Sequence, residues 1–155
     1  MTIRPAHPAE LEQLTAICMR SKAHWGYSPA FMAACAAELA VTTADLARDH
    51  VVVSESDGRP AAVAQLALDG AQAVLVRLFV DPASLRCGHG RRLWDWAVDR
   101  AARSGARVLV LDADPYAEAF YHRLGAVTTG QVPSTTWPGR MLPRIEMPLS
   151  GAGNR

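Results

Sequence analysis

The chain has 155 residues, of which 50% are hydrophobic and 20% are charged, a balance typical of one globular domain with a sizeable core. A formal net charge of +1 argues against nucleic acid as a general partner. No apolar run approaches membrane-spanning length or resembles a signal sequence, and neither the three cysteines nor the five histidines show the spacing of a disulfide framework or a metal site. We therefore expect a cytoplasmic protein with reduced thiols, no bound metal and no membrane contact.

The first forty residues predict a short strand followed by two helices. Residues 2–4 favour a strand, and residues 8–22 carry apolar side chains at the 3.6-residue period of a helix. Ser28 is a good N-cap and Pro29 suits the first helical position. A second helix is therefore expected to run to about Leu39.

An aromatic loop separates these two helices and contains Trp25 and Tyr27. One interpretation is that the two rings fill the gap between the helices, as large aromatic residues often do. The other is that they line a pocket for the substrate. Trp25 and Tyr27 are thus the candidate substrate-binding residues.

The middle of the chain predicts a three-stranded antiparallel meander. Residues 43–48 are expected to form a turn. Two Asp-Gly pairs, beginning at Asp57 and Asp69, are typical of tight hairpin turns. They separate runs rich in β-branched residues, which we interpret as strands over residues 50–55, 61–68 and 73–80.

A loop with two glycines follows the third of these strands. The strand ends at Asp81-Pro82, and Gly88 and Gly90 stand at the start of a helical pattern that runs to Arg103. The first turn of a helix has unpaired backbone N–H groups and a partial positive charge, and glycine lets a phosphate come close to them. Strand, glycine loop and helix in this order predict a phosphate site.

Three arginines surround the loop and would add full positive charge to such a site: Arg86, Arg91 and Arg92. The alternative is a tight turn with a solvated basic face. The loop does not fit the usual nucleotide patterns, because Gly90 has no third glycine after it at the dinucleotide spacing and no Gly-Lys-Ser/Thr is present.

The next segment predicts a further strand and helix. Residues 107–111 are expected to form a strand, in which all residues after Arg107 are apolar. Joined to the earlier strand by a helix, this strand should lie parallel to it through a right-handed crossover. Asp114 can cap a helix that Gly125 ends. Tyr121 falls on the apolar face of that helix, where a tyrosine is usually packed with its hydroxyl satisfied. The last two strands are expected within residues 128–149.

The strand end and the glycine loop together resemble the acetyl-CoA motif of the GNAT N-acetyltransferases. In that family a strand ending in V-x-P leads to R/Q-x-x-G-x-G/A at the start of a long helix. Residues 80–82 read VDP and residues 88–90 read GHG, in register with that pattern. The chain departs from it at Leu85, where the family has Arg or Gln, and a basic residue follows one place later at Arg86.

A second signature of the family, N-x-x-A-x-x-F/L-Y-x-x-x-G-F, is matched after the next strand. The matching residues are Ala117, Phe120, Tyr121 and Gly125. Asp114 stands in place of the Asn, and Ala126 replaces the final aromatic residue. Two motifs in the right order, separated by the expected strand, are far more specific than either alone.

The resemblance implies a mixed α/β fold. It would be a single GNAT-like domain over residues 1–149 with a loose tail over residues 150–155. Its centre would be a twisted, mostly antiparallel sheet with one splayed parallel strand pair and about four flanking helices. The cosubstrate would be acetyl-CoA, with its pantetheine arm along the strand and its pyrophosphate on the loop. The implied cofactor-binding residues are Leu78, Phe79, Val80, Arg86, Cys87, Gly88, His89, Gly90, Arg91 and Asp112.

Within that set, Cys87 and His89 are expected to use their backbone rather than their side chains. The activity implied is direct transfer of an acetyl group to a primary amine of a small molecule in a ternary complex. Tyr121 would be the catalytic acid that protonates the departing thiolate.

The base that takes the proton of the amine is unassigned. Glu38, Glu55, Asp112, His24 and a water chain are all candidates. The strand before the loop lacks the carboxylate common in the family, which supports an alternative, a non-catalytic acyl-CoA sensor. A third reading, acetylation of charged tRNA, lacks the basic surface it would require. A homodimer is left open.

Overall fold

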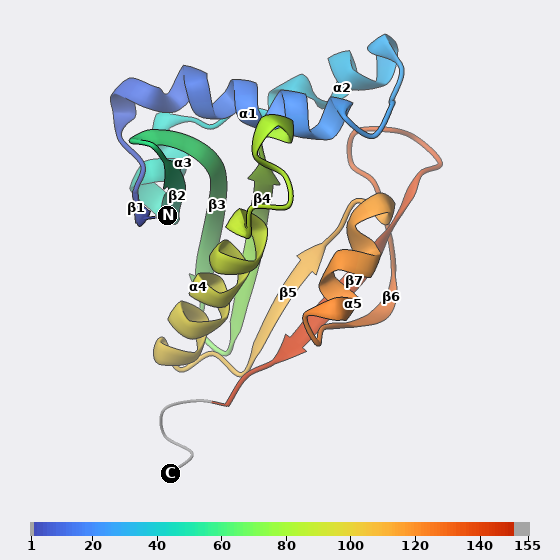
Figure 1. Cartoon of the computed structure of the whole chain (residues 1–155). Helices are drawn as coiled ribbons and strands as arrows, with labels where there is room; N and C mark the ends of the chain where they lie inside the picture. The colour runs from blue at the N-terminus through green and yellow to red at the C-terminus, as the bar shows by residue number, and fades with distance from the viewer. Residues whose placement is uncertain (1, 151–155) are drawn as a thin grey trace.

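A seven-stranded sheet runs through residues 2–150, the part of the chain that the computed structural model describes (Figure 1). The spatial order is β1-β2-β3-β4-β5-β7-β6, and all neighbouring pairs are antiparallel except β4 and β5. The mixed, mostly antiparallel sheet with one parallel pair is therefore confirmed. Its strands are β1 (Thr2–Pro5), β2 (His50–Ser56), β3 (Arg59–Asp69), β4 (Gln72–Val80), β5 (Val108–Asp112), β6 (Val127–Pro133) and β7 (Met141–Pro148).

Five α-helices and three short 3₁₀ turns connect the strands. The helices are α1 (Leu11–Ala23), α2 (Pro29–Leu39), α3 (Thr43–Arg48), α4 (His89–Arg103) and α5 (Glu118–Arg123); the 3₁₀ turns are η1 (Pro8–Glu10), η2 (Pro82–Ser84) and η3 (Pro115–Ala117). None of the helices described here is both long and apolar enough to span a bilayer. Of the tail predicted over residues 150–155, all but Ser150 lies outside the described residues.

The helix ends follow the local capping rules, but one helix was not predicted from the sequence. Ser28 caps α2 as expected, accepting a hydrogen bond from the Phe31 N–H at 3.1 Å. The turn predicted over residues 43–48 is wrong, because this segment forms α3. Thr42 and Asp45 make a reciprocal capping box that satisfies the first free N–H groups of this short helix.

Two hydrophobic clusters lie on opposite faces of the sheet. One packs the sheet against α4 and α5, and the other packs it against α1 and α2. Strand β2 contributes to both, since Val52 belongs to the first cluster while Val51 and Val53 belong to the second. The central strands are thus covered on both sides, which explains their nearly continuous apolar sequences.

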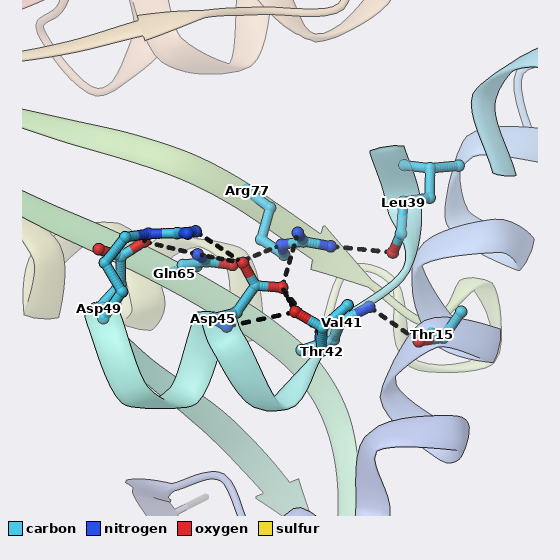
Figure 2. A network of polar contacts seen from close by, with 9 residues as sticks. Thr15, Leu39, Val41, Thr42, Asp45, Asp49, Gln65 and Arg77 are labelled. Atoms are coloured by element: carbon cyan, nitrogen blue, oxygen red, sulfur yellow. Dashed lines mark hydrogen bonds and ion pairs between the residues drawn. The ribbon is translucent and has the colours of Figure 1, made fainter. Parts of the chain in front are cut away.

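Buried Arg77 holds the α2–α3 connection onto the sheet (Figure 2). From β4, its guanidinium donates to the Gln65 side chain and to the Leu39 carbonyl oxygen, both at 2.8 Å, and forms an ion pair with Asp45 at 3.6 Å. Gln65 in turn donates to Asp45 and Asp49. The only charged residue of β4 therefore serves a structural network that joins two strands to two helices.

The parallel strands β4 and β5 pair over a short length and then diverge. Pairing is limited to residues 72–74 of β4 and 108–110 of β5. Beyond that point, no strand of the described chain pairs with this edge of β4, and the two strands separate toward the end of the molecule where α1 and α2 lie (Figure 1). The result is a fork with free backbone groups along one arm.

A β-bulge in β4 occurs where the strands part. Gln65 of β3 is opposite Arg77, but its neighbour Leu66 is opposite Leu75, so Val76 has no partner in the register. An extra residue bends a strand and increases its local twist. We attribute the divergence of β4 from β5 to this bulge.

Candidate active site

A cavity of about 770 Å³ opens at the fork between β4 and β5. Its walls come from five separate parts of the chain: the diverging half of β4, the loop before α4, the end of β5 with η3 and α5, helices α1 and α2, and the β6–β7 connection. The sheet topology brings these segments together, although they are far apart in the sequence.

Most of the predicted cofactor-binding residues line this cavity. They are Leu78, Phe79, Val80, Arg86, Gly88, His89, Gly90, Arg91 and Asp112. Cys87 is not among the lining residues; its thiol is exposed and donates to the Leu85 carbonyl oxygen at 3.6 Å. The fold therefore gathers nine of these ten residues around one space, and their contact with a cofactor stays a prediction.

The loop between β4 and α4 has an unusual backbone. Gly88, the N-cap of α4, has φ +89°, and Arg86 has φ +64°, a conformation that costs a residue with a side chain more than it costs glycine. Asp81 holds the start of the loop, because its carboxylate accepts from the Ala83 N–H at 3.2 Å and from Arg20 of α1 at 2.6 Å. The loop thus curls in a defined shape around the first turn of α4.

His89 turns its side chain into the protein rather than toward the cavity opening. The ring is buried, and Nδ1 lies 2.7 Å from the Ser54 hydroxyl of β2. Burial lowers the pKa of His89, which favours the neutral ring. The Nδ1 atom of His89 is thus committed to Ser54, and contact of a ligand with the His89 backbone stays a prediction.

Tyr121 lies on α5 with its ring packed and its hydroxyl free. The ring contacts Trp94 and Phe120, with centroids 5.3 and 5.0 Å away. The side chain is only 5% exposed, and no hydrogen bond to the hydroxyl occurs within residues 2–150. Yet no buried side-chain oxygen or nitrogen of this region lacks a partner, so the hydroxyl must reach the cavity that Tyr121 lines. Burial raises the pKa of Tyr121, which keeps the phenol protonated.

The two aromatic residues of the α1–α2 loop have different environments. Trp25 lines the cavity, is 42% exposed and stacks on Tyr116 at a centroid distance of 5.3 Å. Tyr27 does not line it, and its ring stacks on Phe31 at 4.2 Å. The pocket-lining interpretation therefore describes Trp25, which faces the cavity. The packing interpretation describes Tyr27, which fills the gap beside α2.

Asp114 is the centre of a polar cluster that sequence reasoning missed. Its carboxylate accepts from the Tyr27 hydroxyl at 2.8 Å and forms ion pairs with Lys22 at 2.8 Å and Arg140 at 3.4 Å. Although burial favours the protonated acid, the Lys22 ammonium and the other donors hold the pKa of Asp114 below its ordinary range. The sequence signals that Asp114 can cap a helix, which it does through the Tyr116 N–H at 2.9 Å, and that it stands in place of the Asn of the second signature, but neither signal reveals these partners.

Three of the four candidate side chains for the general base line the cavity. His24, Glu38 and Asp112 line it, whereas Glu55 does not and is bonded to Arg4 at the β1–β2 edge. Asp112 also forms an ion pair with Arg144 at 3.7 Å. Within the described residues, no three His, Cys, Asp or Glu side chains are grouped so that they could hold a metal ion.

The fork, the loop and the cavity form a single strand–loop–helix site. A family model described as an acetyltransferase (GNAT) domain matches residues 27–137. This match covers more than half of the chain, and the chain belongs to the GNAT family of N-acetyltransferases. A search of curated protein sequences finds no match.

Solved structures of GNAT proteins share the whole fold. The chain is 26% identical to yncA from Salmonella typhimurium, solved with its cofactor acetyl-CoA; the alignment covers 97% of this chain and 94% of that one with a TM-score of 0.69. It is 25% identical to the ribosomal-protein-S18-alanine N-acetyltransferase from Escherichia coli, with 99% and 97% coverage and a TM-score of 0.72. The PaiA N-acetyltransferase from Thermoplasma acidophilum, solved with coenzyme A, is 16% identical, with 95% and 98% coverage and a TM-score of 0.80, a likeness in fold alone.

Proposed function

We propose that this N-acetyltransferase transfers the acetyl group of acetyl-CoA directly to a primary amine of a small molecule, within a ternary complex and a single domain over residues 1–149. One observation carries the proposal: a single cavity is lined by the loop before α4, by Tyr121 and by the polar residues Lys22, Glu38, Asp114 and Arg140. We call the part lined by these four polar residues the chamber. Relatives solved with acetyl-CoA or coenzyme A support the donor.

The free arm of the fork would hold the donor. Residues 78–80 pair with β3 on one edge only, so their other edge offers backbone N–H and C=O groups to the amides of the pantetheine arm. The first turn of α4 offers N–H groups and a partial positive charge to the pyrophosphate. Arg86 and Arg91 line the same part of the cavity and add full charges.

The chemical step would need one acid and one proton acceptor. The amine nitrogen attacks the thioester carbonyl carbon, the new C–N bond forms, and the C–S bond breaks. The Tyr121 hydroxyl donates its proton to the sulfur as the thiolate leaves. A phenol that stays protonated and opens into the cavity suits this role.

The proton lost by the amine would leave through the chamber. Glu38 and His24 are the least committed candidate bases: Glu38 is exposed and one of its oxygens accepts from Thr136 at 2.9 Å, and the His24 side chain makes no hydrogen bond or ion pair within the described residues. Asp112 is already paired with Arg144, and His24 lies beside Trp25. A water chain to any of these groups would serve as well.

A thiol-detection assay tests the proposal directly. The protein is incubated with acetyl-CoA and a panel of amino acids, amino-acid amides, simple alkylamines and aminoglycosides, and the release of free CoA is followed. We expect at least one acceptor to raise the rate well above hydrolysis. Tight binding of acetyl-CoA without turnover across the whole panel would instead favour an acyl-CoA sensor.

A further inference from the structure

The cluster around Asp114 contains more positive than negative charge. Lys22 comes from α1 and Arg140 from the β6–β7 connection, and both side chains line the cavity. Both are largely buried, with 13% and 16% of the side chain exposed. Asp114 is the one carboxylate of the described chain that forms an ion pair with either of them. A single anion therefore faces two cations in a largely desolvated place.

Asp114 has little capacity left for a ligand. Its two oxygens already accept from the Tyr27 hydroxyl, the Tyr116 N–H and both cations. Tyr27 is also committed, because its oxygen accepts from Arg140 at 2.5 Å. The carboxylate and the phenol thus position the two cations, and neither is available to a substrate.

The cations, in contrast, have donors to spare. Arg140 uses only Nη2 within the described residues, so Nε and Nη1 have no protein partner there. No buried nitrogen in this part of the chain is left unbonded, which means that these two atoms are accessible, and Arg140 lines the cavity. Lys22 has three N–H donors and a single ion pair. Both cations also lie over the rings of Tyr27 and Phe31, contacts that use the faces of these rings and leave N–H donors free. A guanidinium edge beside an ammonium is a good receptor for a carboxylate.

The cluster also lies near the reacting groups. Asp114 follows β5 closely, and its charge acts on the Tyr121 hydroxyl. An anion bound by Lys22 and Arg140 would therefore lie in the same cavity as an amine poised beside Tyr121. Glu38, which lines the same chamber, offers an acceptor for the amine end. Opposite charges at the two ends match a zwitterion.

We infer that the acceptor is an amine that carries a carboxylate, such as a free amino acid, and that Lys22 and Arg140 bind this carboxylate. The inference rests on the proposed acetyl transfer to a small amine and specifies its substrate class. Burying two cations around one anion is costly, and a bound carboxylate would compensate the excess charge. Lys22 and Arg140 act as specificity residues.

Matched acceptors test the inference in the wild-type protein. Phenylalanine is compared with phenylalaninamide and phenethylamine, because the stacked Trp25–Tyr116 wall suits an aromatic side chain; alanine, glutamate and their α-amides are run beside them. We expect kcat/KM to be roughly 10- to 100-fold higher for the carboxylate of at least one pair, as for loss of a charge-assisted hydrogen bond. Equal or better turnover of every amide would overturn the inference.

Variants separate binding of the carboxylate from support of the cavity. Arg140→Gln and Lys22→Met should raise KM for the preferred carboxylate acceptor roughly tenfold or more and change KM for its amide little. Arg100→Gln is the control, since it removes a positive charge of α4 that does not line the cavity. It should affect the acid and the amide alike. Equal losses for both acceptors in Arg140→Gln would indicate a purely structural role and refute the inference.

The two proposals fail in different ways. If no amine at all releases CoA from acetyl-CoA, the proposed acetyl transfer fails, and the acceptor class with it. If amines without a carboxylate are acetylated as well as or better than those with one, acetyl transfer stands and only the carboxylate site is rejected.

Discussion

Gly90 lies directly against Phe120, and a Cβ on this glycine would come within 3.2 Å of Phe120 Cζ. The same Cβ would be 3.6 Å from a methyl group of Val80. The missing side chain therefore lets the first turn of α4 approach α5 and β4 closely. The sequence pattern explained both loop glycines by room for a phosphate, but at Gly90 the close approach is to the protein itself.

We expect Gly90→Val to destabilise the fold by about 1–3 kcal/mol, because the added methyl groups overpack the α4–α5 contact. The displacement of Phe120 should also disturb its neighbour Tyr121 and lower turnover. Gly130→Val is the matched control, since a Cβ at Gly130 meets nothing within 4 Å. Urea denaturation measures both variants, and equal stability of the two would contradict the packing role of Gly90.

Gly88 and Gly105 have nearly the same backbone, with φ +89° and +90°, at opposite ends of α4. Alanine at either position should cost about 1–2 kcal/mol of stability through the positive φ. Only Gly88→Ala should weaken acetyl-CoA binding, which we expect to be roughly micromolar in the wild type by calorimetry. Unchanged acetyl-CoA affinity in Gly88→Ala would argue that the loop does not hold the cofactor.

Tyr121→Phe keeps the ring against Trp94 and removes the hydroxyl that opens into the cavity. Turnover should fall roughly 10²- to 10⁴-fold, the usual worth of a positioned acid, with acetyl-CoA affinity nearly unchanged. Stability should change little, because the hydroxyl makes no hydrogen bond within the described residues. A folded variant with near-normal turnover would rule out Tyr121 as the acid.

Arg77→Met should destabilise the protein by about 3 kcal/mol, because it leaves the Leu39 carbonyl oxygen and the Gln65 side-chain oxygen without their donor and removes the ion pair with Asp45. Arg103→Met removes an ion pair with Asp99 at 3.1 Å in which both side chains are exposed, and it should cost less than about 1 kcal/mol. Thermal and chemical unfolding compare the two variants. Similar losses would mean that the network of Figure 2 adds little to stability.

His89 should make stability depend on pH. Burial lowers its pKa in the folded state, so the unfolded chain binds the proton more readily. Its contribution is complete above about pH 6.5, the ordinary range of a histidine, and is lost as the pH falls toward the lowered folded pKa. The free energy of unfolding should thus decrease between pH 7.5 and 5, a window above that in which carboxylates with lowered pKa values titrate.

His89→Gln should flatten this dependence. A slope that persists in His89→Gln would assign the effect to another group.

The sequence alone determined the elements and the two family signatures, since both are local. Ser28 and Pro29 start a helix through contacts within one turn. The two signatures, one with the loop glycines Gly88 and Gly90 and the other with Tyr121 and Gly125, are recognised from the spacing of their residues. The short helix α3 was not predicted, because its capping box uses Asp45 at the position where Glu or Gln is the usual signal.

The tertiary structure alone decided which side chains meet. Tyr27 and Arg140 are 113 residues apart in the chain. They touch because β7 lies between β5 and β6 in the sheet, which places the β6–β7 connection beside the α1–α2 loop. The role of Arg77 likewise depends on helix ends that fold onto β4 from another part of the chain. Periodicity and capping act over a few residues, whereas the pairing of buried charges depends on topology. The fork at the β4 bulge supplies the space in which the charged residues around Asp114 meet.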